Sequence, residues 1–328
     1  VAMGAASSVM TVLVLLSFWW CISPFCKKKN CIAPLCCLIG GTTFTIHATM
    51  NSFGLQCFYT MASYYACYVI GICFTLGIWL RLLMGRKQSL WLIGGCAVLN
   101  IALGMQSLRE LLVLNLPLCV LSLAVSFWSR TGWRNRPNAF AAGMTMANEF
   151  GLALMWLLKR LLHIKQVEIL DAATGGIKER LVHNLSALWR YMGFSQPDGT
   201  FYGWFRLIGP LLVVLLVVCC LIHAVKNRSK EPLACVMAFC VISLAAVVCA
   251  GVLVLHTRGN YYFVWHILVA ACVAYAMETW HIGIKNVVLA GLALISLGNF
   301  VFQFNPVRIF FNVNESYHQE IVDTLRKE

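Results

Sequence analysis

The sequence predicts an all-α protein, a polytopic bundle of about ten transmembrane helices with one long outer loop that carries an interfacial helix. Hydrophobic residues make up 60% of the 328 residues and charged residues only 11%, whereas soluble domains carry roughly a quarter charged residues. The mean hydropathy is +0.79. Apolar residues gather in stretches of about 20, the length that crosses ~30 Å of hydrocarbon. Basic and non-basic loops alternate between these stretches, which is typical of membrane insertion.

The second apolar stretch is the most polar of the series, because Thr42, Thr43 and His47 lie within it. A re-entrant or interfacial segment is therefore an alternative at this position. Omitting this span would place two basic loops on opposite sides of the membrane, so the alternation of charge favours a span. The predicted spans are residues 1–22, 31–50, 57–80, 89–106, 111–128, 139–158, 208–224, 232–255, 261–278 and 286–304.

Positive charge gathers in loops that follow alternate spans, at Lys27–Lys29 and in segments 81–87, 130–136 and 226–230. Short loops rich in Lys and Arg stay in the cytoplasm, so we predict an integral plasma-membrane protein with these loops inside. The same loops account for much of the net charge of +13. No basic patch with interleaved aromatic residues stands on a polar surface, which argues against nucleic-acid binding.

The segment 159–207 is too long for a turn and falls on the outer side. Within it, residues 177–192 have helical spacing, with Leu181, Leu185, Leu188 and Met192 on one face. This pattern predicts a helix that lies on the outer membrane surface. We divide the chain into a bundle, 1–304, and the start of an extracytoplasmic tail, 305–328. Both ends look cut, so we expect the chain to be a piece of a longer protein.

Arg109 and Glu110 occupy the shortest outer turn, between two apolar spans. Arg suits an anionic head group because its planar guanidinium group donates two hydrogen bonds at once. We therefore interpret Arg109 and Glu110 as candidate substrate-binding residues. The alternative is a turn whose charges meet water and each other at the membrane surface.

A second polar outer turn contains His256, Arg258 and Tyr261. These residues are candidates to hold a phosphate and to stack on a sugar, and an interfacial anchor is the alternative. Glu149 follows Asn148 near the middle of the sixth span. A carboxyl group in hydrocarbon is protonated or paired, so Glu149 is a candidate substrate contact or proton relay. A neutral interhelical hydrogen bond is the alternative there.

The sequence predicts no metal site, although a divalent metal stays open. It contains no phosphate-binding Gly loop, no HExxH and no GxSxG motif. Most of the 16 Cys residues fall inside apolar stretches, where they behave as small apolar side chains. The Cys residues between Cys21 and Cys37 lack the paired spacing of zinc ligands.

Several segments together resemble the GT-C class of integral membrane glycosyltransferases, in particular poorly characterised bacterial members. They are residues 104–110, 116–118, 184–193 and 258–265 and the tail after Pro306, and the resemblance covers most of the chain. It implies a polyprenyl-phosphate sugar as donor, a cell-surface glycan or lipid as acceptor, and chemistry on the outer face. The class has a catalytic acidic residue in its first outer loop. No residue here matches that position, so the catalytic residue is unknown.

Two other functions fit the same pattern. A polysaccharide transporter, flippase or polymerase would also span the membrane many times, although transporters are commonly built from paired halves and we see no internal duplication. A non-catalytic membrane scaffold could bind a partner through the tail after residue 305. The sequence does not identify protein partners, the sugar or the oligomeric state.

Overall fold

The computed structural model describes residues 2–44, 62–129, 132, 134–163, 176–194, 201–227, 231–253 and 259–303, and within these residues it is helical, with no strand. The prediction of an all-α fold is confirmed. The α-helices are α1 (Ala2–Ile22), α2 (Ile32–Phe44), α4 (Ala62–Leu83), α5 (Leu90–Gln106), α6 (Leu116–Trp128), α7 (Arg136–Leu161), α8 (Ile177–Tyr191), α9 (Phe201–Lys226), α10 (Pro232–Leu253), α11 (Val264–Thr279) and α12 (Ile282–Gln303).

Five of the described helical segments are long and apolar enough to cross a membrane. They are Tyr65–Leu83, Leu111–Trp128, Leu207–Lys226, Pro232–Leu253 and Tyr261–Thr279. Three shorter apolar helical segments, Ser8–Ile22, Leu90–Gln106 and Ile282–Leu294, accompany them. These lengths are compatible with an integral membrane protein, and the remaining predicted spans stay predictions.

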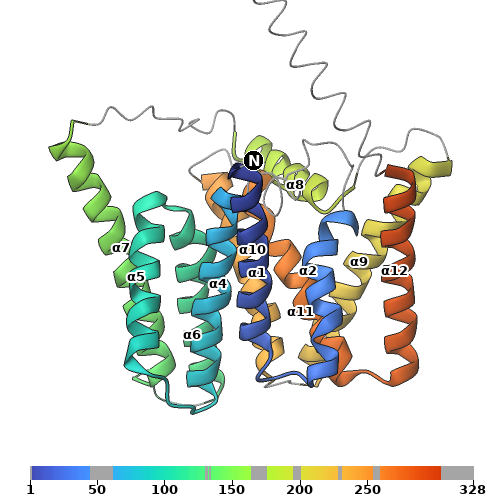
Figure 1. Cartoon of the computed structure of the whole chain (residues 1–328), viewed down its shortest axis with the longest axis horizontal. Helices are drawn as coiled ribbons and strands as arrows, with labels where there is room; N and C mark the ends of the chain where they lie inside the picture. The colour runs from blue at the N-terminus through green and yellow to red at the C-terminus, as the bar shows by residue number, and fades with distance from the viewer. Residues whose placement is uncertain are drawn as a thin grey trace, which may run out of the picture.

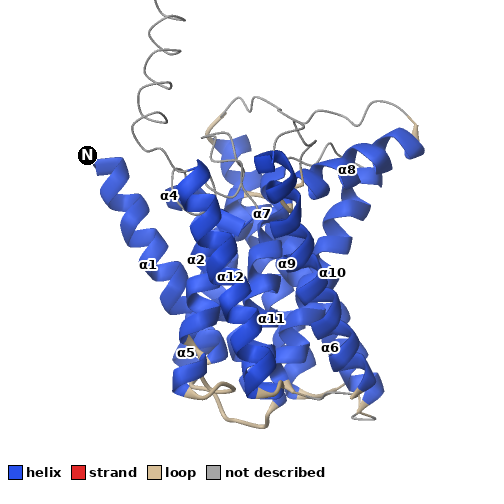
Figure 2. Cartoon of the chain, turned by 90° about the vertical axis from the view of Figure 1, so that its right-hand side faces the viewer, coloured by secondary structure: helices blue, strands red, loops and turns tan. Residues whose placement is uncertain are grey.

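The long helices stand side by side, and α8 lies across one end of the bundle (Figure 1). The described parts of the loops that follow α1, α4 and α6 gather at the opposite end (Figure 2), which we call the basic end because these loops carry Lys27–Lys29, Arg86, Lys87 and Arg134. Hydrogen bonds join helix termini there. The backbone N–H of Lys27 donates to Glu278 Oε1 over 2.7 Å, and Arg81 Nη2 donates to the Trp20 carbonyl over 2.6 Å. The described residues of the predicted basic loops therefore share one end of the bundle.

Helix α11 forms the centre of the core, since every residue from Val264 to Met277 is buried. A helix that is apolar all round is expected to be enclosed by other helices. Accordingly, α11 packs against α2, α9 and α10. Its one buried His, His266, lies against the ring of Tyr191 from α8, with 5.3 Å between the ring centroids.

Glycines bring α5 and α7 into close contact. A Cβ at Gly104 would overlap the Asn148 carbonyl oxygen, and a Cβ at Gly151 would overlap that of Ile101. Asn148 Nδ2 also donates to the Asn100 carbonyl over 3.2 Å. Small residues and interhelical hydrogen bonds are how helices associate where hydrocarbon surrounds them. The contact holds α5, and therefore the turn that follows it, in a defined position.

Replacing Gly151 with alanine is expected to destabilise the protein by about 1–3 kcal/mol, because the added methyl group meets a backbone carbonyl that cannot move aside. Gly143, on the same helix, has open space at its Cβ and is the matched control. Gly143→Ala should leave stability unchanged or slightly raised, since Ala favours helix over Gly. Thermal unfolding in detergent compares the two variants, and equal midpoints would contradict the close contact.

A π-helical turn, Leu111–Asn115, separates Arg109 and Glu110 from α6. Pro117 explains this break, because proline has no N–H to donate to the carbonyl of Val113, four residues earlier. Ser243 on α10 supplies the missing donor, with Oγ 2.7 Å from that carbonyl. The helix therefore changes from α to π winding directly after Arg109 and Glu110. Such π turns inside helices are frequent at functional sites.

Candidate functional site

Arg109 lies in the first turn of the helix that leads into α6. Ser107 is extended and ends α5, and its Oγ accepts a 2.9 Å hydrogen bond from the backbone N–H of Arg109. A Ser at this position caps the helix that follows by satisfying one of its first N–H groups. The start of that helix carries a partial positive charge, so both the side chain and the backbone of this turn favour an anion.

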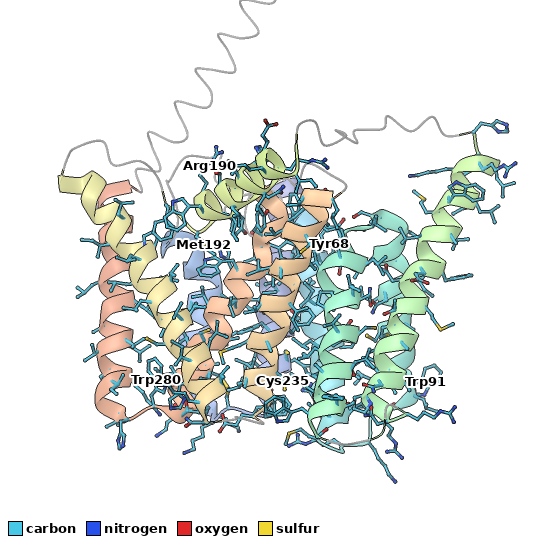
Figure 3. The ribbon with its side chains drawn as sticks, turned by 180° about the vertical axis from the view of Figure 1, so that it is seen from behind. Tyr68, Trp91, Arg190, Met192, Cys235 and Trp280 are labelled. Carbon is cyan, nitrogen blue, oxygen red and sulfur yellow. The ribbon has the colours of Figure 1, made fainter. Side chains whose placement is uncertain are left out.

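Three tyrosine rings surround the guanidinium of Arg109. Its Cζ lies 4.4 Å from the ring centroid of Tyr261, 4.6 Å from that of Tyr68 and 5.3 Å from that of Tyr65. These distances are within the range of cation–π attraction. Figure 3 places Tyr68 toward the end of the bundle at which Arg190 of α8 and Met192, just after α8, lie. Ring contacts engage the faces of a guanidinium, whereas its N–H donors lie in the guanidinium plane. In Arg109 the Nε and Nη1 atoms are buried.

Glu110 is fully buried beside Arg109. Burial raises the pKa of its carboxyl group from 4.5 to about 8, although the positive charge of Arg109 acts in the opposite direction. Neither carboxyl oxygen has a hydrogen-bond partner among the described residues, and the same is true of the side-chain amide of Asn115, one π turn later. At neutral pH Glu110 is therefore mostly uncharged, and it does not cancel the charge of Arg109.

Helix α8 is held over this end of the bundle by the C-terminus of α10. Arg180 Nη1 donates to the Val252 carbonyl over 3.0 Å. Asn184 fits against Gly251, where a Cβ would overlap its side-chain amide. The Tyr262 hydroxyl donates to the Asn184 carbonyl over 3.1 Å. Tyr261 and Tyr262 are adjacent, so one short segment contacts both Arg109 and α8.

The predicted helix over 177–192 is present, but its leucine face contacts the bundle only in part, through Leu188 and Met192, which pack against the core. Asn184 and Tyr191 are buried, whereas Leu181 is 40% exposed and Leu185 is 47% exposed. The reason is that the end of α10 offers a backbone carbonyl and a glycine surface, which suit Arg180 and Asn184 better than leucines. An apolar strip of α8 consequently faces outward.

Replacing Arg180 with alanine is expected to loosen α8, because the hydrogen bond from its charged group to Val252 is lost. Such bonds contribute about 1.5–3 kcal/mol. Amide hydrogen exchange of residues 177–191 should speed up by about tenfold or more if α8 opens locally. Lys178→Ala removes an exposed charge from the same helix and should leave exchange unchanged. Similar exchange in both variants would show that Arg180 does not hold α8.

No family model, curated protein or solved structure matches this chain. Among the described residues, no group of three or more His, Cys, Asp or Glu side chains could hold a metal ion.

The structure brings three of the predicted site residues together, Arg109, Glu110 and Tyr261. His256 and Arg258 lie outside the described residues, as does the tail 305–328. Glu149 is on the exposed surface of α7, while its neighbour Asn148 is buried against α5. Arg109, Glu110, Tyr65, Tyr68 and Tyr261 together are called the Arg109 cluster below. No contact joins Glu149 to this cluster within the described part of the chain.

Sequence reasoning missed Tyr65 and Tyr68, which provide two of the three rings around Arg109. Their spacing was an available signal, since residues three apart share a face of a helix. Both lie in the N-terminal half of the predicted third span, residues 57–80. What could not be read from the sequence is that α4 and α5 place this face next to the Arg109 turn.

Proposed function

We propose that this chain is a membrane-embedded glycosyltransferase that transfers a sugar from a polyprenyl-phosphate donor to a cell-surface glycan or lipid acceptor. The observation that carries the proposal is the Arg109 guanidinium, held among Tyr65, Tyr68 and Tyr261 at the end of the bundle opposite the basic loops. The resemblance of the sequence to GT-C enzymes supplies the reaction class. The proposal includes about ten spans, a plasma-membrane location, cytoplasmic basic loops and an outer surface at the α8 end.

In this proposal, Arg109 binds the phosphate of the donor through the in-plane N–H donors of its guanidinium. The tyrosine rings keep the guanidinium in place and offer a stacking surface for the sugar. The acceptor oxygen forms a bond to the anomeric carbon as the bond from that carbon to the phosphate oxygen breaks. Negative charge then builds up on the leaving phosphate, and Arg109 stabilises it.

The acceptor hydroxyl must also lose its proton to a base. Glu110 is buried and mostly protonated at pH 7, so it is a poor base for the acceptor hydroxyl. Its protonation state instead changes the net charge next to Arg109. We therefore assign no described residue to the role of base.

Binding by the purified chain tests the proposal. Radiolabelled polyprenyl phosphate and the matching polyprenol differ only in the phosphate. We expect clear preference for the phosphate, followed by sugar transfer or slow sugar release when a polyprenyl-phosphate sugar is supplied. Equal binding of the two lipids would overturn the proposal, because it would leave Arg109 without a role in recognition.

A transporter or flippase is the second candidate, and the π-helical break at Leu111–Asn115 favours it. Interrupted helices beside buried polar groups are typical of transporter binding sites, and Glu110 and Asn115 are both buried at this break. The assay that separates the two functions uses sealed vesicles. Movement of labelled polyprenyl phosphate across the bilayer without any new glycosidic product would favour transport over transfer.

A further inference from the structure

A cavity of about 670 Å³ lies at the basic end, between the ends of α4, α6, α9 and α10. Its volume is within the roughly 300–1,000 Å³ of ligand sites. Most of its lining is apolar, including Leu83, Val125, Cys235 and Ala238. Figure 3 shows Cys235 at the end of the bundle opposite Tyr68. The cavity is therefore separate from the Arg109 cluster.

The cavity opens onto the outside of the bundle. Val225, Trp128 and Met84 line it and are 76%, 69% and 50% exposed. Large apolar side chains exposed together mark a contact surface. Around a membrane-spanning bundle, the molecules that meet such a surface are lipids, so the cavity is accessible to a lipid chain from the side.

Polar and basic groups border this apolar space. A second cavity of about 490 Å³ shares Ser122 and Asn135 with the first and is lined by Arg134 and Arg136. Hydrogen bonds keep this border in place. Trp79 Nε1 donates to Ser122 Oγ over 3.0 Å, and the Asn135 side chain caps α7 by accepting from the backbone N–H of Asn138 over 2.9 Å. The two arginines are thus anchored beside the apolar cavity by the cap of α7.

We propose that the basic-end cavity binds an anionic phospholipid, with an acyl chain in the apolar cavity and the phosphate at Arg134 and Arg136. Charge complementarity selects this occupant, because both arginines are exposed next to an apolar space. Basic pockets between membrane helices on the cytoplasmic side bind anionic lipid head groups in this way. A neutral lipid or an apolar helix from another protein would bring no negative charge to this basic border. The lipid would join α6 and α7 to α9 and α10, which line the cavity from its other side.

Native mass spectrometry of the full chain, released from detergent micelles, tests this proposal. The probes are phosphatidylglycerol and phosphatidylcholine with identical acyl chains. We expect one phosphatidylglycerol to remain bound in preference to phosphatidylcholine. The double substitution Arg134→Gln/Arg136→Gln should lower its retention by about tenfold or more. Arg86→Gln/Lys87→Gln removes the same charge from the same end, outside the lining of both cavities, and should change retention less than about twofold.

A second pair of variants tests the acyl-chain part of the site. Ala238→Phe fills the cavity without changing charge and should lower phosphatidylglycerol retention, whereas Val241→Phe, on the same helix but outside the lining, should not. Thermal unfolding confirms that each variant is folded. Equal retention of the two lipids, equal losses from both charge pairs, or displacement by glycerol phosphate alone would each overturn the proposal. None of these outcomes depends on the glycosyltransferase proposal.

Discussion

Replacing Arg109 with alanine is expected to weaken binding of a polyprenyl-phosphate sugar by about ten- to a hundredfold. Charge-assisted hydrogen bonds of the kind that a guanidinium makes to phosphate contribute about 1.5–3 kcal/mol, which converts to this range. Arg109→Lys should fall between alanine and the wild type. Lysine keeps the positive charge but lacks the planar guanidinium group, which makes two parallel hydrogen bonds and stacks on the rings of Tyr68 and Tyr261.

Equilibrium binding of the radiolabelled donor to the purified chain measures this effect. Arg190→Ala is the matched control, because Arg190 is exposed on α8 at the same end of the bundle (Figure 3). It removes an equal charge and should change affinity little. A folded Arg109→Ala variant with wild-type affinity would rule out Arg109 as the phosphate ligand and leave the proposed function without its main support.

Binding of the same donor is expected to weaken as pH rises through about 8, the pKa to which burial raises Glu110. Below this pH the carboxyl group is neutral. Above it, a negative charge develops next to Arg109 and repels the donor phosphate. A phosphodiester donor keeps one charge across this range, and Arg109 stays protonated. Besides Arg109, the thiol of Cys67 interacts electrostatically with Glu110. Its Sγ lies 3.6 Å from Gln106 Oε1.

Glu110→Gln should abolish this pH dependence while preserving affinity below pH 8, since glutamine has the shape of the protonated acid. The stability of the protein should also decrease as pH rises. The folded state holds the Glu110 proton up to about pH 8 and the unfolded state only to about 4.5, so the free energy of unfolding falls as pH rises between these values, by about 1.4 kcal/mol per unit at most. Wild type and Glu110→Gln with parallel pH profiles between 6 and 9 would exclude a titrating Glu110.

Helix positions were predictable from the sequence to within a few residues in several places. The stretch predicted as 89–106 is α5, Leu90–Gln106, and the stretch predicted as 232–255 begins α10 at Pro232. These bounds depend on local composition and on neighbouring residues such as Ser89 and Pro232, which favour helix starts. The helix α8 was predictable for the same reason, because amphipathic spacing is a local property.

The candidate site was predictable only in part. Arg109, Glu110 and Tyr261 were expected from their position in outer turns, and they meet in the structure. Tyr65 and Tyr68 were not expected, although they complete the ring of aromatic groups around Arg109. The burial of Glu110 was not predicted either, because the sequence placed this residue in an outer turn, as a substrate-binding residue or as a charge that meets water.

The sequence by itself determined that this is a helical, apolar chain suited to a bilayer and located its helices. Hydrocarbon offers no hydrogen bonds to a backbone, and continuous apolar stretches of about 20 residues satisfy their own backbone groups there as helices. The tertiary structure decided which polar groups meet. Gly104 and Gly151 let α5 and α7 approach, Ser243 satisfies the carbonyl that Pro117 leaves unpaired, and Gly251 and Val252 contact Asn184 and Arg180 of α8. Each of these contacts joins residues far apart in the chain, and its geometry depends on surfaces that local composition does not encode.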